Sequence, residues 1–142
     1  MKAFCEPFLS LDEIGTLVRG LTEKKKIYGL TGCVDGAKSA LLYALTGSFD
    51  YTVYVASTED AARELMQEYL FFDEDACFFP AKDILFYQSD IRGNAIDRER
   101  MESLRGLMEK DRLTVFTSVD ALHNRFPDAR DFLENTIHIK VV

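Results

Sequence analysis

The chain has 142 residues, of which 47% are hydrophobic and 29% are charged, and its 17 basic and 24 acidic side chains give a formal net charge of −7. A chain of this length buries roughly 70% of its unfolded surface, so it can be stable without disulfides or a metal. The negative charge argues against strong binding of nucleic acid, which requires Lys and Arg at the phosphates. No apolar run approaches the ~20 residues that span a bilayer, and the first residues lack a secretory signal, so we expect a cytoplasmic protein.

Cysteine and histidine are too scattered to predict a metal site. Cys5, Cys33 and Cys77 lie far apart in the sequence, as do the two histidines, His123 and His138. Zinc ligands normally come in closely spaced pairs. We therefore predict reduced cysteines and no bound metal.

Helices and strands are expected to alternate along the first half of the chain. Ser10 and Glu13 form a capping-box pattern before a helix that ends near Gly20 or Leu21. Runs of apolar, β-branched and aromatic residues predict strands, and apolar residues at helical spacing predict helices. The next expected elements are a strand at Ile27–Leu30, a helix around Ala40–Leu45, a strand at Tyr51–Ala56 and a helix at Ala61–Leu70.

The second half continues this alternation. Its expected elements are a strand at Ala76–Pro80, a helix at Ala95–Lys110, a strand at Leu113–Thr117, a short helix capped by Ser118, and helical turns at Asp128–Leu133. The loop between Pro80 and Ala95 is long for an α/β connection and carries Ile84, Leu85, Phe86 and Tyr87. Such side chains must either pack on the core or be covered by a neighbour, and in the second case the loop is an interface.

Strands that alternate with helices predict right-handed βαβ units, and hence a parallel α/β sheet with helices on both faces. We assign residues 1–135 to this domain. The final segment, Thr136–Val142, alternates apolar and polar residues as Ile-His-Ile-Lys-Val, which is typical of a half-buried strand. We expect this strand to lead into a following domain, before which the chain is truncated.

A glycine-rich segment between the first expected strand and the second expected helix is similar to a phosphate-binding loop. Such a loop needs inward-pointing backbone N–H groups, a lysine for the phosphates and a hydroxyl for Mg²⁺, in the pattern G-x-x-x-x-G-K-[S/T]. The residues that fit are Gly32, Gly36, Lys38 and Ser39. Ala37 replaces the last glycine, and Asp35 adds a carboxylate that repels phosphate. We interpret the loop as a vestigial phosphate site; weak binding of ATP and Mg²⁺, and a working site completed by another domain, are the alternatives.

The chain offers no evident catalytic residues. A nucleotide hydrolase needs an aspartate after an apolar strand to hold Mg²⁺. Asp120 lies beyond the strand Leu113–Thr117 and fits better in the first turn of the next helix. No general base and no arginine finger can be assigned, so we predict no catalytic residue and no metal ligand.

Two longer stretches resemble the amino-terminal module of the bacterial transcription-repair coupling factors, the Mfd family. The stretch YGLTGCVDGAKSALLYAL resembles the degenerate nucleotide loop of that family, and FPAKDILFYQSDIRGNAIDRERMESL resembles the segment after its third strand. The matching positions in the second stretch are, in order, Pro80, Asp83, Tyr87, Arg98 or Arg100, and Leu104. The resemblance runs from Ile27 to the end of the chain and extends to the first domain of the excision-repair helicase UvrB.

The resemblance implies a three-layer, P-loop or RecA-like domain that keeps the UvrB domain 1a fold and has lost its ATPase. The UvrB loop reads G-x-T-G-x-G-K-T, and this chain begins in the same way at Gly29 but reaches Lys38 later. For the parent protein, the resemblance implies an ATP-dependent DNA translocase that displaces stalled RNA polymerase and recruits UvrA through the adjacent domain. We therefore expect a non-catalytic scaffold domain in transcription-coupled nucleotide excision repair. The alternatives are an ATP-binding half-domain of an active helicase and a general protein-interaction module.

Overall fold

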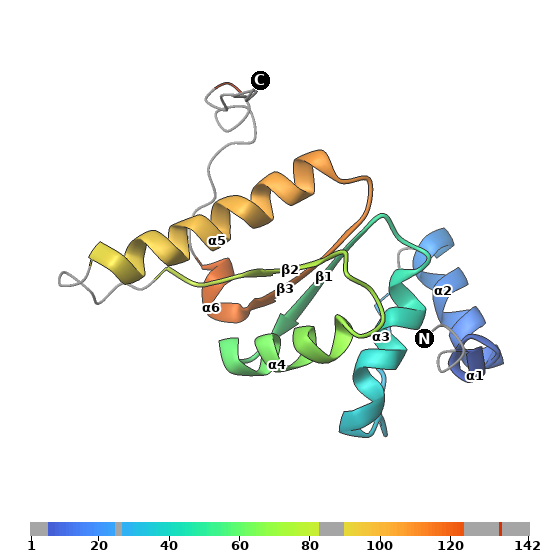
Figure 1. Cartoon of the computed structure of the whole chain (residues 1–142). Coiled ribbons are helices and arrows are strands. Elements are labelled where there is room, and N and C mark those ends of the chain that lie inside the picture. Colours follow the sequence, from blue (N-terminus) through green and yellow to red (C-terminus); the bar gives the residue numbers. More distant parts are fainter. Residues whose placement is uncertain (1–5, 25–26, 83–89, 124–133, 135–142) are drawn as a thin grey trace.

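The computed structural model describes residues 6–24, 27–82, 90–123 and 134 (Figure 1). Its helices are α1 (Glu6–Leu9), α2 (Asp12–Lys24), α3 (Lys38–Thr46), α4 (Glu59–Tyr69), α5 (Asp90–Glu109) and α6 (Val119–Leu122), with a 3-10 turn, η2, at Asp35–Ala37. Its strands are β1 (Tyr51–Ala56), β2 (Ala76–Phe79) and β3 (Leu113–Ser118). From α3 onward, helices and strands alternate as the sequence predicts.

The three strands form one parallel sheet in the order β1-β3-β2. Tyr51 of β1 lies opposite Leu113 of β3, and Ala76 of β2 lies opposite Thr114. Every residue of the central strand β3 is buried, because it has a strand on each side and a helix on each face. The predicted parallel α/β sheet is therefore confirmed, with three strands in the part of the chain that the structure describes.

Helices cover both faces of this sheet, with α4 below it and α5 above it in Figure 1. On the face that we call the α4 face, Tyr43 of α3 and several residues of α4 pack against the sheet. The buried residues there are Ala56, Ala62, Leu65, Tyr69, Phe78 and Phe116. On the opposite α5 face, Leu104 and Leu107 of α5 pack against a second cluster. Its buried residues are Phe79, Leu113, Val115 and Ala121.

The expected strand at Ile27–Leu30 is wrong, because this segment is irregular and lies outside the sheet. Its apolar side chains are exposed, and Ile27 is fully so. Tyr28 instead lies against α2, where a Cβ added to Gly20 would be 1.7 Å from the tyrosine hydroxyl. A run this short, interrupted by Gly29, can form few contacts with a neighbouring strand. The contact of this segment with α2 therefore determines where the segment lies.

The first helix and the last long helix also differ from expectation. The helix expected to end near Gly20 or Leu21 is α2, which continues to Lys24. The hydroxyl of Ser10, the expected cap, donates to the carbonyl oxygen of Pro7 (2.9 Å). The helix expected from Ala95 is α5, which begins at Asp90 and so shortens the loop after β2.

Side chains cap two helices in the sheet region, and the cap at Ser118 is as predicted. The hydroxyl oxygen of Thr58 accepts a hydrogen bond from the backbone N–H of Ala61 at the start of α4, and that of Ser118 accepts one from Ala121 at the start of α6. The predictions for Ile84–Tyr87, Asp128–Leu133 and Thr136–Val142 fall outside the described residues.

Candidate functional site

The glycine loop joins the segment beside α2 to the first turn of α3. Gly32 has a φ of 78°, in the left-handed region that disfavours a Cβ, so the backbone requires glycine at this position. The chain then passes through η2 and enters α3 at Lys38, followed by Ser39. In a phosphate-binding loop, a preceding strand anchors the loop to the edge of the sheet. In the described part of the chain no strand precedes this loop, because residues 27–31 are irregular.

Two backbone amides of the loop are used within the loop itself. The N–H of Ala37 donates to the carbonyl oxygen of Val34 (3.0 Å), and the N–H of Lys38 donates to that of Asp35. Ala37 has φ −99° and ψ −9°, a right-handed conformation that accommodates its methyl group. A phosphate nest needs neighbouring N–H groups that converge on one anion. In this loop, the 3-10 turn uses two of them instead.

The lysine of the motif forms an ion pair with the aspartate of the same loop. Lys38 Nζ lies 2.6 Å from Asp35 Oδ1, and the side chains are 49% and 95% exposed, respectively. The hydrogen bond from Lys38, together with its charge, lowers the pKa of the Asp35 carboxyl. In turn, the hydrogen bond to Asp35 and its charge raise the pKa of Lys38. At neutral pH both groups are therefore charged, and a carboxylate occupies the ammonium group that a phosphate would need.

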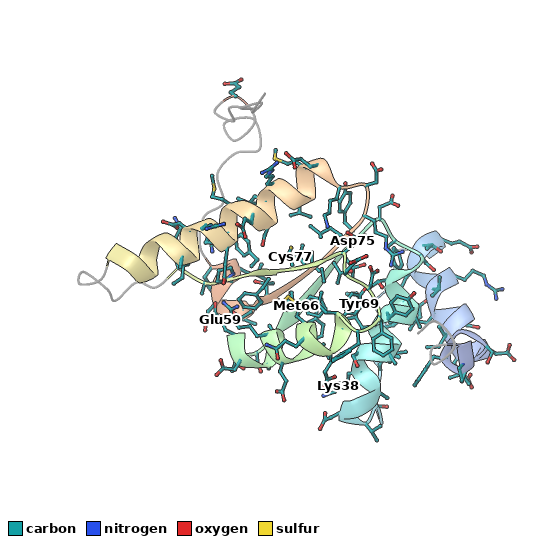
Figure 2. All side chains as sticks on the ribbon, viewed as in Figure 1. Lys38, Glu59, Met66, Tyr69, Asp75 and Cys77 are labelled. Carbon is teal, nitrogen blue, oxygen red and sulfur yellow. The ribbon has the colours of Figure 1, made fainter. Side chains whose placement is uncertain are left out.

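The hydroxyl-bearing residue of the motif lies in a different environment. Ser39 is 4% exposed within the domain, whereas Lys38 is exposed at the surface. Figure 2 shows Lys38 at the start of α3 and Glu59 at the start of α4. A hydroxyl ligand of Mg²⁺ must face the same phosphates as the lysine. The structure thus brings Asp35 and Lys38 together but leaves Ser39 inside the domain.

The carboxyl edge of the sheet, where parallel α/β proteins usually bind ligands, carries Asp120. This residue lies in the first turn of α6, as predicted. Within the residues that the structure describes, no group of three or more His, Cys, Asp or Glu side chains could hold a metal ion. A pocket of about 430 Å³ lies elsewhere, between α2 and Tyr28–Leu30. The described loop residues Gly32–Ser39 do not line that pocket.

Two arginines hold the carboxyl end of β2, a feature that sequence reasoning missed. On the α4 face, Arg63 stacks on Phe78, with 3.8 Å between its guanidinium carbon and the ring centre. On the α5 face, Arg100 stacks on Phe79 at 4.1 Å and donates a hydrogen bond to the carbonyl oxygen of Pro80 (2.6 Å). Arg100 is 4% exposed, and its burial lowers the pKa of the guanidinium. Each face of this short strand is thus covered by a cation.

Acidic side chains complete what we call the β2 clamp, defined by Arg63, Arg100, Glu59 and the end of β2. Glu59, at the start of α4, accepts a hydrogen bond from the backbone N–H of Ala81. Glu99 of α5 pairs with Arg63 at 2.9 Å and so links α5 to α4. The sequence carried one signal for this feature, since the family resemblance includes Pro80 and an arginine at position 98 or 100.

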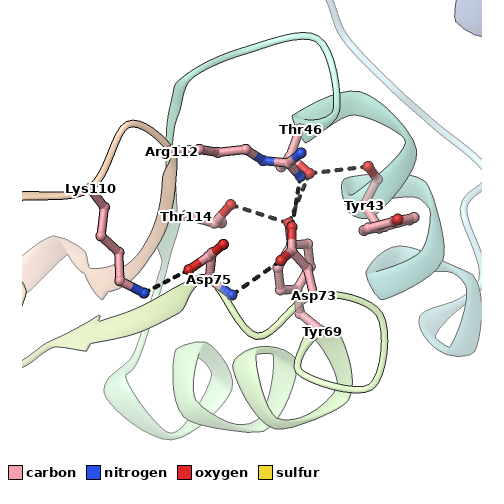
Figure 3. Close-up of polar contacts among 8 residues, drawn as sticks. All are labelled: Tyr43, Thr46, Tyr69, Asp73, Asp75, Lys110, Arg112 and Thr114. Carbon is pink, nitrogen blue, oxygen red and sulfur yellow. Dashed lines mark hydrogen bonds and ion pairs between the residues drawn. The ribbon is translucent and has the colours of Figure 1, made fainter. Parts of the chain in front are cut away.

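A polar network lies at the opposite, amino edge of the sheet (Figure 3). The buried hydroxyl of Tyr69 lies 2.8 Å from Thr46 Oγ1, 3.2 Å from Thr114 Oγ1 and 3.5 Å from Asp73. Arg112 Nη2 pairs with Asp73 at 2.6 Å. In the described part of the chain, no buried side-chain nitrogen or oxygen is without a hydrogen-bond partner. We therefore assign this network to the stability of the fold rather than to a ligand.

An ion pair extends this network on the solvent side. Lys110, before β3, lies 2.6 Å from Asp75, before β2. The hydrogen bond to Asp75 raises the pKa of Lys110. The pair joins the two segments that lead into neighbouring strands.

Comparison with protein-family models, with curated proteins and with solved structures gives no significant match for this chain. Among the described residues, no helix has both the length and the apolar character that crossing a membrane requires.

Proposed function

We propose that this chain is a non-catalytic scaffold domain of a transcription-repair coupling factor that acts in transcription-coupled nucleotide excision repair. Two arguments support the proposal: the resemblance of the sequence to the UvrB-like module of that family, and the state of the glycine loop. The observation that carries the non-catalytic role is the ion pair between Asp35 and Lys38. A RecA-like ancestry of the sheet is part of the same proposal.

The ion pair opposes nucleotide binding in two ways. A phosphate would have to replace Asp35 as the partner of Lys38, and it would then lie beside a carboxylate of the same sign. The amides of Ala37 and Lys38 would also have to leave the carbonyl groups that they now contact. Together these changes cost free energy. A loop with glycine at positions 35 and 37 would not incur this cost.

The way in which β2 is held supports the proposed scaffold role. The β2 clamp fixes Pro80 and Ala81, the residues that lead into Ile84–Tyr87. A rigid base of this kind would present that apolar segment, our candidate interface, to a neighbouring domain of the parent protein. In this proposal, UvrA binds the adjacent domain, RNA polymerase and DNA bind other parts of the parent, and the complex works in the cytoplasm.

Restoring the loop tests the proposal. The double variant Asp35→Gly/Ala37→Gly removes the carboxylate and the methyl group, so we expect it to bind Mg-ADP at least ~tenfold more tightly than the native chain. The matched control is the same double variant with Lys38→Ala, which should lose the gain. A double variant with no gain in affinity would contradict descent from a phosphate loop.

The alternative is an ATP-binding half-domain of an active helicase. It is favoured by the position of Lys38 and Ser39, which begin α3 directly after the glycine loop. This alternative predicts that the native chain binds Mg-ATP and that Lys38→Ala abolishes binding. A general interaction module, in contrast, predicts that neither the native loop nor the restored loop binds nucleotide.

A further inference from the structure

The two edges of the sheet, β1 on one side and β2 on the other, differ in how they are protected. β2 has only four residues, is followed by Pro80, and is held by the β2 clamp, in which Glu59 accepts the hydrogen bond of the Ala81 amide. Short length, proline and charge are means by which edge strands avoid pairing with other chains. β1 has six residues, Tyr-Thr-Val-Tyr-Val-Ala, without a charge, a proline or a glycine. The β1 edge therefore lacks the features that protect the β2 edge.

The side of β1 that lies on the α5 face is also exposed. Tyr51, Val53 and Val55 point to this face, because Tyr54 and Ala56 pack on the α4 face and side chains alternate along a strand. They are 49%, 57% and 41% exposed. Helix α5 packs against β2 and β3, and no described strand pairs with the outer edge of β1. A strand whose backbone and apolar side chains are both accessible is a template for pairing with another chain.

We propose that β1 pairs antiparallel with β1 of a second copy of this chain, about a two-fold axis that passes between the two Val53 residues. The two copies then form one continuous sheet in which both α5 faces lie on the same side. Tyr51 of each copy lies opposite Val55 of the other, so the exposed side chains of both copies meet in one apolar row. Aromatic and β-branched side chains are favourable neighbours across a strand pair.

The backbone of β1 fits this register. The N–H of Leu113 donates to the carbonyl oxygen of Asp50, so the polar groups of residue 50 face β3. Because these groups alternate along a strand, those of Tyr51, Val53 and Val55 face the outer edge. In the proposed pairing, each Val53 exchanges both of its backbone hydrogen bonds with Val53 of the other copy, and each Tyr51 does so with Val55. Every outward N–H and C=O group of β1 then has a partner, as an interface between two identical surfaces requires.

Charge permits a second copy on this edge, and the size of the contact sets how strongly it binds. The pairing strand is uncharged, so the two-fold axis brings no like charges opposite each other along it. Each copy carries a net charge of −7, and salt screens the resulting repulsion. Strands of this length meet over only about 20 Å, which places the contact among the weak, reversible interfaces below about 1,200 Å². We therefore expect a dimer that forms at high micromolar concentration and tightens as salt rises.

Sedimentation equilibrium and residue-resolved amide exchange by NMR, both on the full chain, test the proposal. Between about 10 μM and about 1 mM the chain should pass from monomer to dimer. The Val53 and Val55 amides should be protected from exchange at the higher concentration and should exchange at least ~tenfold faster on dilution. The Thr52 and Tyr54 amides face β3, so they should stay protected at both concentrations and report that the sheet is intact.

The register has a signature of its own. Thr52 of one copy and Tyr54 of the other form a non-hydrogen-bonded pair, in which the two Cα atoms approach to about 4.5 Å. A sample that mixes isotope-labelled and unlabelled chains should therefore show a nuclear Overhauser contact between the α-protons of these two residues. Val53→Lys places two lysines at the axis and should raise the Kd of the dimer at least ~tenfold. The matched control is Phe71→Lys, which makes the same change in net charge at an exposed site after α4 and should leave the Kd unchanged.

Four results would overturn the proposal. The first is a monomer at every concentration, and the second is a dimer that Val53→Lys weakens no more than Phe71→Lys does, which would use another surface. The third is protection of Val53 and Val55 that survives dilution, which would assign the edge to another segment of the same chain. The fourth is a dimer without the contact between Thr52 and Tyr54, which would have another register or direction. If Val53→Lys unfolds the chain, the concentration dependence of the native chain still decides the proposal. None of these results depends on nucleotide binding, so the proposed function is tested separately.

Discussion

The hydroxyl of Tyr69 links α3, α4 and β3, and removing it should destabilise the fold. Tyr69 is fully buried, and its hydroxyl contacts the hydroxyl groups of Thr46 and Thr114. In the Tyr69→Phe variant, Thr46 keeps its hydrogen bond to the carbonyl oxygen of Tyr43, but the buried hydroxyl of Thr114 loses its tyrosine partner. One lost hydrogen bond and one unsatisfied hydroxyl each cost about 1 kcal/mol, so we expect a loss of about 2 kcal/mol in the free energy of unfolding.

Urea denaturation followed by circular dichroism measures this loss, and thermal unfolding should show a fall in Tm of about 4–8 °C. The matched control is Tyr51→Phe, because the Tyr51 hydroxyl donates to the carbonyl oxygen of Lys110 at an exposed site. That variant should change the free energy by less than about 0.5 kcal/mol.

A double-mutant cycle separates the lost bond from the unsatisfied group. Thr114→Val should cost about 1 kcal/mol in the native chain and close to nothing in the Tyr69→Phe background, because the second change removes the unsatisfied hydroxyl. A Tyr69→Phe variant as stable as Tyr51→Phe would refute the reasoning. Fully additive effects of Tyr69→Phe and Thr114→Val would refute the coupling through this network.

Three further predictions concern the loop, the β2 clamp and the cysteines. Because Lys38 lowers the pKa of Asp35, that carboxyl should stay ionised until the pH falls through its depressed pKa, and Lys38→Met should raise its NMR titration midpoint toward the ordinary value; an unchanged midpoint would contradict the ion pair. Arg100→Met should lower the free energy of unfolding in urea by about 1–3 kcal/mol, because the Pro80 carbonyl loses a donor. The control Arg98→Met, at an exposed ion pair with Glu102, should lower it by less than about 0.5 kcal/mol. Equal losses in the two variants would contradict a stabilising role of the β2 clamp. Burial raises the pKa of the Cys77 thiol, so iodoacetamide at pH 8 should alkylate exposed Cys33 well before Cys77, as followed by peptide mass spectrometry; the reverse order would contradict the packing of β2.

The sequence predicts the elements whose pattern is long and regular. β1, α4 and β3 were found where β-branched runs and helical spacing placed them, because burial in the sheet satisfies the same pattern. The predicted strand at Ile27–Leu30 is wrong because a short apolar run can pack on the surface of a helix as well as in a sheet. Its contact with α2 through Tyr28 is a tertiary choice that local pattern does not encode.

The candidate site could be predicted only where its residues are neighbours in the sequence. The glycine-rich motif contains Gly32, Gly36, Lys38 and Ser39 within one short stretch, and the same stretch shows that the Asp35 carboxylate is unfavourable to phosphate. The spacing of Asp35 and Lys38 could also have suggested their pairing, since residues three apart meet on one side of a helical turn. The β2 clamp joins residues from α4, β2 and α5, and such a meeting follows from the fold and not from spacing along the chain.

Calorimetric titration of Mg-ATP and Mg-ADP into the native chain, with Lys38→Ala as the control, tests the central claim most directly. A non-catalytic scaffold with Lys38 paired to Asp35 predicts no heat of binding up to millimolar nucleotide in either protein. Micromolar binding that Lys38→Ala abolishes would contradict the account and establish Lys38 as a phosphate ligand of an ATP-binding half-domain.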